Sequence, residues 1–253
     1  LRVTGVQTCA LPICDIMPLM RLDKYLSECT ALSRSRLREI IKNGSVCVDG
    51  VPVTAPEQKL DSDAAHVSLD GKPVRYEKFC YYMLNKPSGL LSATDDKKQK
   101  TVIDLFPAEL RKKNLFPVGR LDKDTAGLLI ITNDGEFAHR VISPKSEIVK
   151  TYHACTESPV DDADVEAFRQ GIVLADGTQC LPAGLEKLPD GSCLVRVMEG
   201  KYHQVKRMLA SRGKPVTELK RLSIGALELD KSLLPGQFRQ LTEKELCSVN
   251  KKK

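Results

Sequence analysis

A charged segment that leads directly into an apolar run is the feature of this sequence that most constrains its fold. Residues 119–125 (GRLDKDT) are followed by the apolar run 128–131 (LLII) and by the turn signal 133–135 (NDG). A short apolar run that ends at a turn signal is typical of a buried strand. The charged residues are therefore predicted to lie at the edge of the core, where this strand begins.

Asp122 has two possible roles in such a segment. In an ordinary turn, Asp122 or Asp124 would accept hydrogen bonds from nearby backbone amides. Alternatively, Asp122 stands at a strand edge and faces a cleft, where Arg120 and a second cation keep it ionised for nucleophilic attack or proton abstraction. The segment by itself does not decide between the two roles.

The motif GRLD at 119–122, followed by GLLIITNDG at 127–135, resembles the catalytic signature of the RsuA/RluA-type pseudouridine synthases. In that family the Asp of this motif is the essential residue. The resemblance extends over nearly all of the chain after Met20. It implies that Asp122 is catalytic and that Arg120 contacts the substrate.

Composition sets the broad class of protein. With 253 residues, of which 42% are hydrophobic, the chain can hold a sizeable core, divided into one small and one larger domain. The net charge of +6 favours a polyanionic partner. There is no apolar run of about 18 residues, so no membrane-spanning helix is expected. Nine cysteines are scattered without a C-x-x-C pair, which predicts reduced thiols in a cytosolic protein and argues against a disulfide framework or a zinc site.

The two ends of the chain differ from the rest. Residues 1–16 resemble translated sequencing-adapter read-through, and a proline interrupts the short apolar stretch that mimics a signal peptide. Residues 1–19 are therefore treated as a non-native or disordered leader, with the true start at Met17 or Met20. The basic tail 251–253 is predicted to be disordered.

A small domain of two helices and short strands is predicted for residues 20–74. Leu22, Tyr25 and Leu26 share one face of a first helix, and Ser33 is a suitable N-cap for a second helix. Valines on both sides of an Asp-Gly turn then predict a hairpin. This arrangement resembles the S4 RNA-binding domain. The resemblance implies phosphate contacts, instead of an ordinary solvated helix face, for the basic residues Arg34, Arg36, Arg38 and Lys42.

Residues 79–250, which follow a linker at 75–78, are predicted to form the larger, catalytic domain. Strands are expected at 79–84, 128–131, 171–174, 184–188 and 192–198, and helices at 136–142 and 161–170. The chain has no phosphate-binding glycine loop, which argues against a Rossmann or P-loop enzyme. The predicted fold class is therefore α+β, with a mixed or antiparallel sheet.

Two further motifs of the same family are present. YMLNKPSG at 82–89 matches the first motif, in which a Lys-Pro turn shapes the floor of the cleft. This implies that Lys86 contacts the substrate, and an ordinary connecting turn is the alternative. KTY at 150–152 implies that Tyr152 is a catalytic residue, which stacks on the flipped base and takes part in proton transfer, and a core aromatic residue is the alternative.

The segment 199–209 (EGKYHQVKRML) resembles the third motif, in which a basic residue pairs with the catalytic Asp. That position is Lys206, and a cation there would favour the charged form of the carboxylate. Arg207, like Lys201 and His203, is assigned either to RNA phosphates or to a solvated helix face. Leu222 matches a family leucine that packs against the target base, and a core leucine is the alternative.

The resemblance implies an enzyme that isomerises uridine to pseudouridine without a cofactor or a metal. The S4 domain and the form of the third motif are most similar to the branch that modifies a single uridine of 16S rRNA, of the position-516 type. The expected partner is ribosomal RNA in a pre-ribosomal particle, and the expected protein is a cytoplasmic monomer. A large-subunit rRNA enzyme and a non-catalytic RNA-binding assembly protein are the alternatives.

Overall fold

The computed structural model describes residues 19–30 and 32–249. The chain divides into two compact units, Leu1–Lys78 and Phe79–Lys253. Most of the expected leader and the basic tail lie outside the described residues. Within the described ranges, no helix has both the length and the apolar character needed to cross a membrane.

The first unit consists of two helices and two small sheets. Its four-stranded sheet has the order β3-β2-β5-β6, and β1 pairs with β4. The elements are β1 (Leu19–Arg21), α1 (Leu22–Cys29), α2 (Arg34–Lys42), β2 (Val46–Val48), β3 (Val51–Pro52), β4 (Lys59–Asp61), β5 (Val67–Leu69) and β6 (Lys72–Val74).

Both predicted helices and the predicted hairpin of this unit are confirmed. In α1 the side chains of Leu22, Tyr25 and Leu26 are buried at the spacing expected of one helix face. The N-cap of α2 is Ser33, whose hydroxyl accepts a hydrogen bond from the backbone N–H of Arg36. One boundary is wrong: Leu19, assigned to the leader, is the first residue of β1 and pairs with Asp61 in β4.

The second unit is built on one large sheet. Its strands are β7 (Tyr81–Lys86), β8 (Phe116–Pro117), β9 (Ala126–Thr132), β10 (Lys150–Thr156), β11 (Gly184–Lys187), β12 (Cys193–Val197), β13 (Val216–Ile224), β14 (Leu227–Glu228) and β15 (Phe238–Gln240). Its helices are α3 (Ala108–Arg111), α4 (Gly135–Ile142), α5 (Asp162–Gln170), α6 (Gln204–Ser211) and α7 (Glu243–Val249), with 3-10 turns at Val102–Leu105 and Pro144–Ser146.

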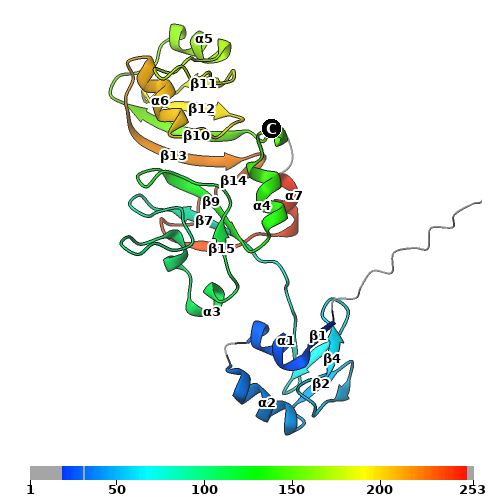
Figure 1. The fold of residues 1–253 in the computed structure, drawn as a ribbon. Coiled ribbons are helices and arrows are strands. Elements are labelled where there is room, and N and C mark those ends of the chain that lie inside the picture. The colour runs from blue at the N-terminus through cyan, green and yellow to red at the C-terminus, as the bar shows by residue number, and fades with distance from the viewer. Residues whose placement is uncertain (1–18, 31, 250–253) are drawn as a thin grey trace, which may run out of the picture. The chain divides into compact units, whose positions relative to one another are not determined.

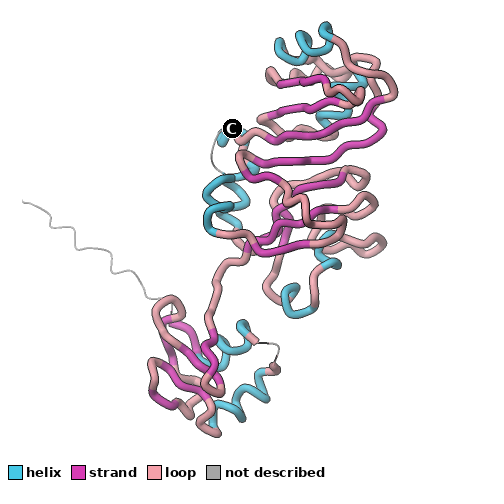
Figure 2. Tube along the Cα trace, turned by 180° about the vertical axis from the view of Figure 1, so that it is seen from behind, coloured by secondary structure: helices cyan, strands magenta, loops and turns pink. Residues whose placement is uncertain are grey.

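The sheet is mixed, which is one of the two arrangements predicted for the α+β class. The strand order is β11-β12-β10-β13-β9-β7-β15, with β8 paired to β9 and β14 paired to β13. All pairings are antiparallel except that of β9 with β13. In Figure 1, α5 and α6 lie against the half that contains β10 to β12, and α4 and α7 lie against the other half. The same succession of strands is seen from behind in Figure 2.

Strand β9 explains why the apolar run 128–131 marks the centre of the fold. Leu128 and Ile130 belong to one hydrophobic cluster, and Leu129 and Ile131 belong to another. The strand is therefore covered on both faces, and a strand covered on both faces needs apolar side chains at successive positions.

The strand predicted at 171–174 is wrong. Gly171 ends helix α5 with a φ of 91°, and Val173 makes only an isolated bridge to Gln179. The turn predicted at Asn85 and Lys86 also differs, because both residues continue β7.

The two halves of the sheet meet where β9 and β13 run parallel. Only two residue pairs join these strands, Lys220 with Ala126 and Arg221 with Gly127. Gly127 has a φ of 103°, and a Cβ atom there would lie 2.2 Å from the carbonyl oxygen of Arg221. Only glycine fits this backbone conformation and this close approach.

We expect Gly127→Ala to lower the free energy of unfolding by more than about 3 kcal/mol, since it combines a backbone clash with an unfavourable φ. Urea denaturation measures the effect. Gly135→Ala is the matched control, because nothing lies within 4 Å of a Cβ at that helical position. The control is expected to be neutral or stabilising by up to about 1 kcal/mol. If Gly127→Ala and Gly135→Ala lowered the free energy of unfolding equally, this account of the strand junction would be contradicted.

Candidate active site

The segment 119–125, called the GRLD loop below, is held by backbone contacts just before β9. The hydroxyl of Ser92 donates to the carbonyl oxygen of Leu121 at 2.8 Å and accepts from its N–H at 3.1 Å. The N–H of Gly89 donates to the carbonyl oxygen of Lys123 at 2.7 Å. These bonds fix the loop backbone from the side of the turn that follows β7.

Lys86 anchors the same loop from beneath. Its side chain is completely buried, and its ammonium donates to the carbonyl oxygens of Asp122, Lys123 and Thr125 at 3.2, 3.1 and 2.9 Å, and of Pro87 at 3.1 Å. Burial lowers the pKa of Lys86 to about 8. The expectation that Lys86 contacts the substrate is therefore wrong, because its donors are directed to backbone oxygens inside the protein.

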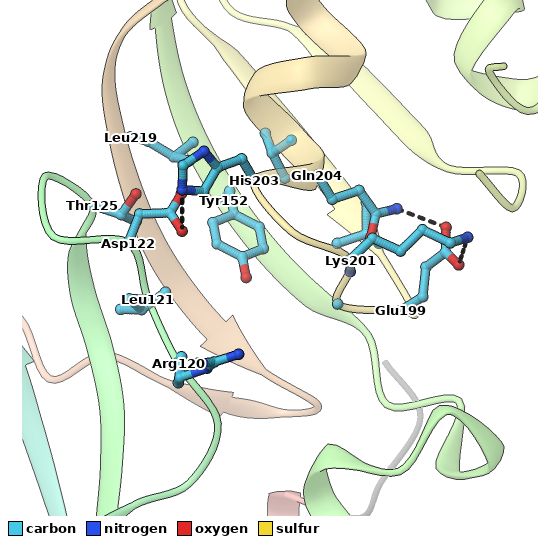
Figure 3. A pocket seen from close by; sticks show the side chains of 13 residues that line it. Arg120, Leu121, Asp122, Thr125, Tyr152, Glu199, Lys201, His203, Gln204 and Leu219 are labelled. Atoms are coloured by element: carbon cyan, nitrogen blue, oxygen red, sulfur yellow. Dashed lines mark hydrogen bonds and ion pairs between the residues drawn. The ribbon is translucent and has the colours of Figure 1, made fainter. Parts of the chain in front are cut away.

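Asp122 projects from this loop into a pocket at the junction of the two halves of the sheet. Its side chain is 27% exposed. Arg120 and Asp122 lie on one side of the pocket and Lys201 on the other, with Tyr152 of β10 between them (Figure 3). Residues far apart in the sequence thus converge around one partly exposed carboxylate.

Two basic side chains from the start of α6 approach Asp122. Nε2 of His203 lies 3.4 Å from Oδ1, and Nζ of Lys206 lies 3.8 Å from Oδ2. Lys206 is closer to Asp124, at 2.5 Å from Oδ1, and this hydrogen bond lowers the pKa of Asp124. The structure thus brings Lys206 near Asp122, as the motif suggested, but as a cation shared with a second carboxylate.

His203 is the residue of this site that sequence reasoning missed. The motif assigns it to RNA phosphates or to a solvated helix face, whereas its ring lies against Asp122 (Figure 3). The reason is its backbone, which adopts the left-handed conformation with φ 48° and ψ 34° at the N-cap of α6. Few residues other than glycine take this conformation, although histidine is enriched among those that do.

Tyr152 is supported by a buried arginine. The guanidinium carbon of Arg221 lies 6.0 Å from the centre of the tyrosine ring. Nε of Arg221 donates to the carbonyl oxygen of Leu128 at 2.8 Å, which ties β13 to β9. This contact fixes the wall behind Tyr152 at the junction of the two strands.

The assignment of Leu222 to this pocket is wrong. Leu222 lines a separate cavity of about 360 Å³ together with Thr151. The leucines that line the Asp122 pocket are Leu121 and Leu219, and both are buried. The pairing of β10 with β13 shifts here, from Thr151 opposite Ser223 to Tyr152 opposite Arg221, so Leu222 is left without a partner in the register.

Arg120 and Arg207 have different environments. Arg120 is exposed and lines the pocket. Arg207 does not line it, because its guanidinium lies 2.6 Å from the carboxylate of Asp176 and also donates to the carbonyl oxygen of Tyr202. The proposed substrate contact of Arg207 is therefore not supported by its position.

The basic residues of α2 belong to the other unit, and all four are exposed. Arg36 pairs with Glu39 at 2.9 Å, and Arg38 pairs with Asp23 at 3.2 Å. Neither Arg34 nor Lys42 has an ion-pair partner among the described residues. Among all residues that the structure describes, in both units, no group of His, Cys, Asp or Glu side chains is arranged to hold a metal ion.

We expect Lys86→Met to lower the free energy of unfolding by about 2–4 kcal/mol at neutral pH, because several buried carbonyl groups lose their donor. The exposed Lys123→Met in the same loop is the control, with an expected change within about 0.5 kcal/mol. The pKa of Lys86 is about 8 when folded and 10.5 in its unperturbed state. The unfolded chain therefore binds more protons between these values, and wild-type stability should rise relative to Lys86→Met across that window. Urea unfolding at about pH 7 and about pH 9.5 measures the trend. It would be contradicted if the free energies of unfolding of wild type and Lys86→Met differed by the same amount at both pH values.

The sequence and fold match known proteins along most of the chain. Residues 80–211 match a family model described as RNA pseudouridylate synthase, and residues 20–65 match the S4 domain. The chain is 43% identical over 235 residues to the uncharacterized RNA pseudouridine synthase YtzG of Bacillus subtilis, covering 91% of this chain and 98% of that protein. It is 40% identical over 232 residues to ribosomal small subunit pseudouridine synthase A of Escherichia coli, covering 91% and 100%. The crystal structure of a pseudouridylate synthase has a TM-score of 0.65 at 35% identity and covers 91% and 99%.

Proposed function

Because the chain belongs to the RNA pseudouridylate synthase family, we propose that it isomerises uridine to pseudouridine in ribosomal RNA, with Asp122 as the catalytic residue. The observation that carries this assignment is the carboxylate of Asp122, which is partly exposed in a pocket beside Tyr152 and close to His203 and Lys206. An acid with this access can reach a bound nucleotide, whereas a carboxylate that only caps a turn has no such pocket in front of it.

The proposed reaction breaks the N1–C1′ bond of uridine, turns the uracil in place and joins C5 to C1′. The C5 proton is lost and N1 regains one, so substrate and product are isomers and no redox step occurs. The base has to leave its stack before the bond becomes accessible. Asp122 would either attack the nucleotide or abstract the 2′ proton, while Tyr152 stacks on the flipped base and Arg120 contacts the RNA.

We further propose that the target is a single uridine of 16S rRNA, of the position-516 type, in a pre-ribosomal particle. The full-length similarity to a small-subunit enzyme supports this choice. Scattered cysteines and an rRNA substrate both fit a cytoplasmic protein. A monomer is the simplest form, because residues of a single chain line the Asp122 pocket. A large-subunit target is the alternative within the family.

The S4 unit would supply affinity for the phosphate backbone. The similarity to the S4 domain includes the helix that carries Arg34 and Lys42, both of which project into solvent without a carboxylate partner among the described residues. When cationic side chains of this kind bind RNA phosphates, the counterions condensed on the RNA are released. Arg36 forms an ion pair with Glu39, and Arg38 forms one with Asp23. These two arginines would either break the ion pairs to bind phosphates or bind phosphates while the pairs remain.

Asp122→Asn is expected to reduce pseudouridine formation by about a hundredfold or more, since it removes the proposed nucleophile or base while preserving size. Pseudouridine mapping in both rRNAs of a deletion strain that carries each variant provides the measurement. Glu109→Gln, which removes an exposed carboxylate of α3, is the control.

The same mapping separates the alternatives. Wild-type turnover by Asp122→Asn would refute the catalytic role, and product confined to large-subunit rRNA would move the target there. RNA binding by the wild-type chain without any product would favour a non-catalytic assembly protein.

The double variant Arg34→Ala/Lys42→Ala is expected to weaken RNA binding and to reduce the slope of log K against log salt by about 1.5, as two phosphate contacts are lost. Filter binding or fluorescence anisotropy over a salt series measures the slope. Lys59→Ala/Lys72→Ala removes the same charge from exposed strand positions of the same unit. If the two double variants have equal slopes, the phosphate contacts of α2 are refuted.

A further inference from the structure

Tyr202 and His203 form an aromatic stack that the proposed chemistry does not use. Their ring centroids lie 3.8 Å apart, and the rings are tilted by only 19°. Tyr202 is 75% exposed, more than any other large apolar side chain among the described residues. One face of the tyrosine ring is therefore covered by His203, while most of the rest is open to water.

The backbone beneath this stack is held in an uncommon conformation. His203 is a non-glycine residue with a φ of 48°. The carbonyl oxygen of Tyr202 accepts a hydrogen bond from Arg207, whose guanidinium is fixed by Asp176. Backbone conformations of this kind cost free energy and are concentrated at functional sites.

The stack is continuous with the pocket of Asp122. His203 lines that pocket, and its Nε2 lies 3.4 Å from Oδ1 of Asp122 (Figure 3). The ring of His203 thus lies between the ring of Tyr202 and the pocket. A planar group that stacked on Tyr202 would extend the series of rings that ends beside the carboxylate.

We propose that Tyr202 and His203 are a stacking platform for the nucleobase next to the target uridine in single-stranded RNA. The proposal rests on the proposed function, which brings an unstacked RNA segment to this pocket. A base beside a flipped nucleotide loses a stacking neighbour, and an aromatic ring can replace it. Every base has a π-face, so the platform favours unpaired RNA without selecting one base. Exposed Arg120 adds a positive charge at the same pocket for the phosphates.

The test uses 16S rRNA fragments that carry 2-aminopurine on either side of the modified uridine, with the full-length chain. Wild-type protein should quench the fluorescence of one probe through stacking. Tyr202→Ala should abolish the quench and raise Kd and KM about 5- to 100-fold. Its kcat should change by less than about threefold, because Tyr202 binds RNA and does not line the pocket of the reacting atoms. Tyr202→Phe should restore the quench and the affinity, since it retains the ring.

Leu234→Ala is the matched control, because it removes an exposed apolar side chain at a turn away from the pocket residues. Thermal unfolding should be the same for the control and for Tyr202→Ala. A wild-type quench and affinity in Tyr202→Ala would overturn the platform. So would a Tyr202→Phe variant as weak as Tyr202→Ala, and so would a loss of kcat without a change in KM.

The experiment also separates the platform from the proposed function. If wild-type protein forms no pseudouridine but quenches the probe through Tyr202, the function is wrong and the platform stands. If Asp122→Asn abolishes product while Tyr202→Ala behaves as wild type, the function stands and the platform is refuted. A protein partner in place of RNA would leave the probe fluorescence unchanged in every variant, which refutes the platform.

Discussion

The buried ammonium of Lys86 is the interaction on which the GRLD loop depends. A charged amine removed from water is unfavourable unless all of its donors are satisfied. Here the carbonyl oxygens of Asp122, Lys123 and Thr125 converge on it from one loop. This convergence fixes the loop backbone, and the backbone fixes the direction in which the side chain of Asp122 leaves it. The anchor is therefore buried, although its effect is the position of a partly exposed carboxylate.

The basic side chains near Asp122 leave its carboxylate oxygens without a short hydrogen bond. Charge-assisted hydrogen bonds to a carboxylate are about 2.7–2.9 Å long. His203 and Lys206 stand 3.4 and 3.8 Å away, and Lys206 makes its short contact with Asp124 instead. A carboxylate that attacks a carbon atom or takes up a proton needs a free oxygen. The second carboxylate of the loop leaves Asp122 that freedom while keeping the ammonium within range.

Sequence patterns predict the elements that depend on neighbouring residues, but they do not predict contacts between residues far apart in the sequence. The helices of the first unit and strand β9 follow from spacing and apolar runs alone. By contrast, Lys86 reads as a surface residue, since nothing nearby in the sequence reveals that distant carbonyl groups surround it. Leu222 lies at a register shift between β10 and β13, which the local sequence does not reveal. The position of His203 depends on its left-handed backbone conformation, which few non-glycine residues adopt and which the spacing of residues does not predict.

The pocket lies at the narrowest connection in the sheet, and this has a mechanical consequence. Asp122 comes from the β9 side, whereas Tyr152 and His203 come from the other half. Two residue pairs, one of them Arg221 with Gly127, join β13 to β9, and Ile224 of β13 belongs to the same hydrophobic cluster as Leu128 and Ile130 of β9. A packed core resists small displacements far better than a short ladder does. The distance between the carboxylate and its basic neighbours is therefore set at this junction, by the packing of Ile224 against β9 together with the close contact of Gly127 with Arg221.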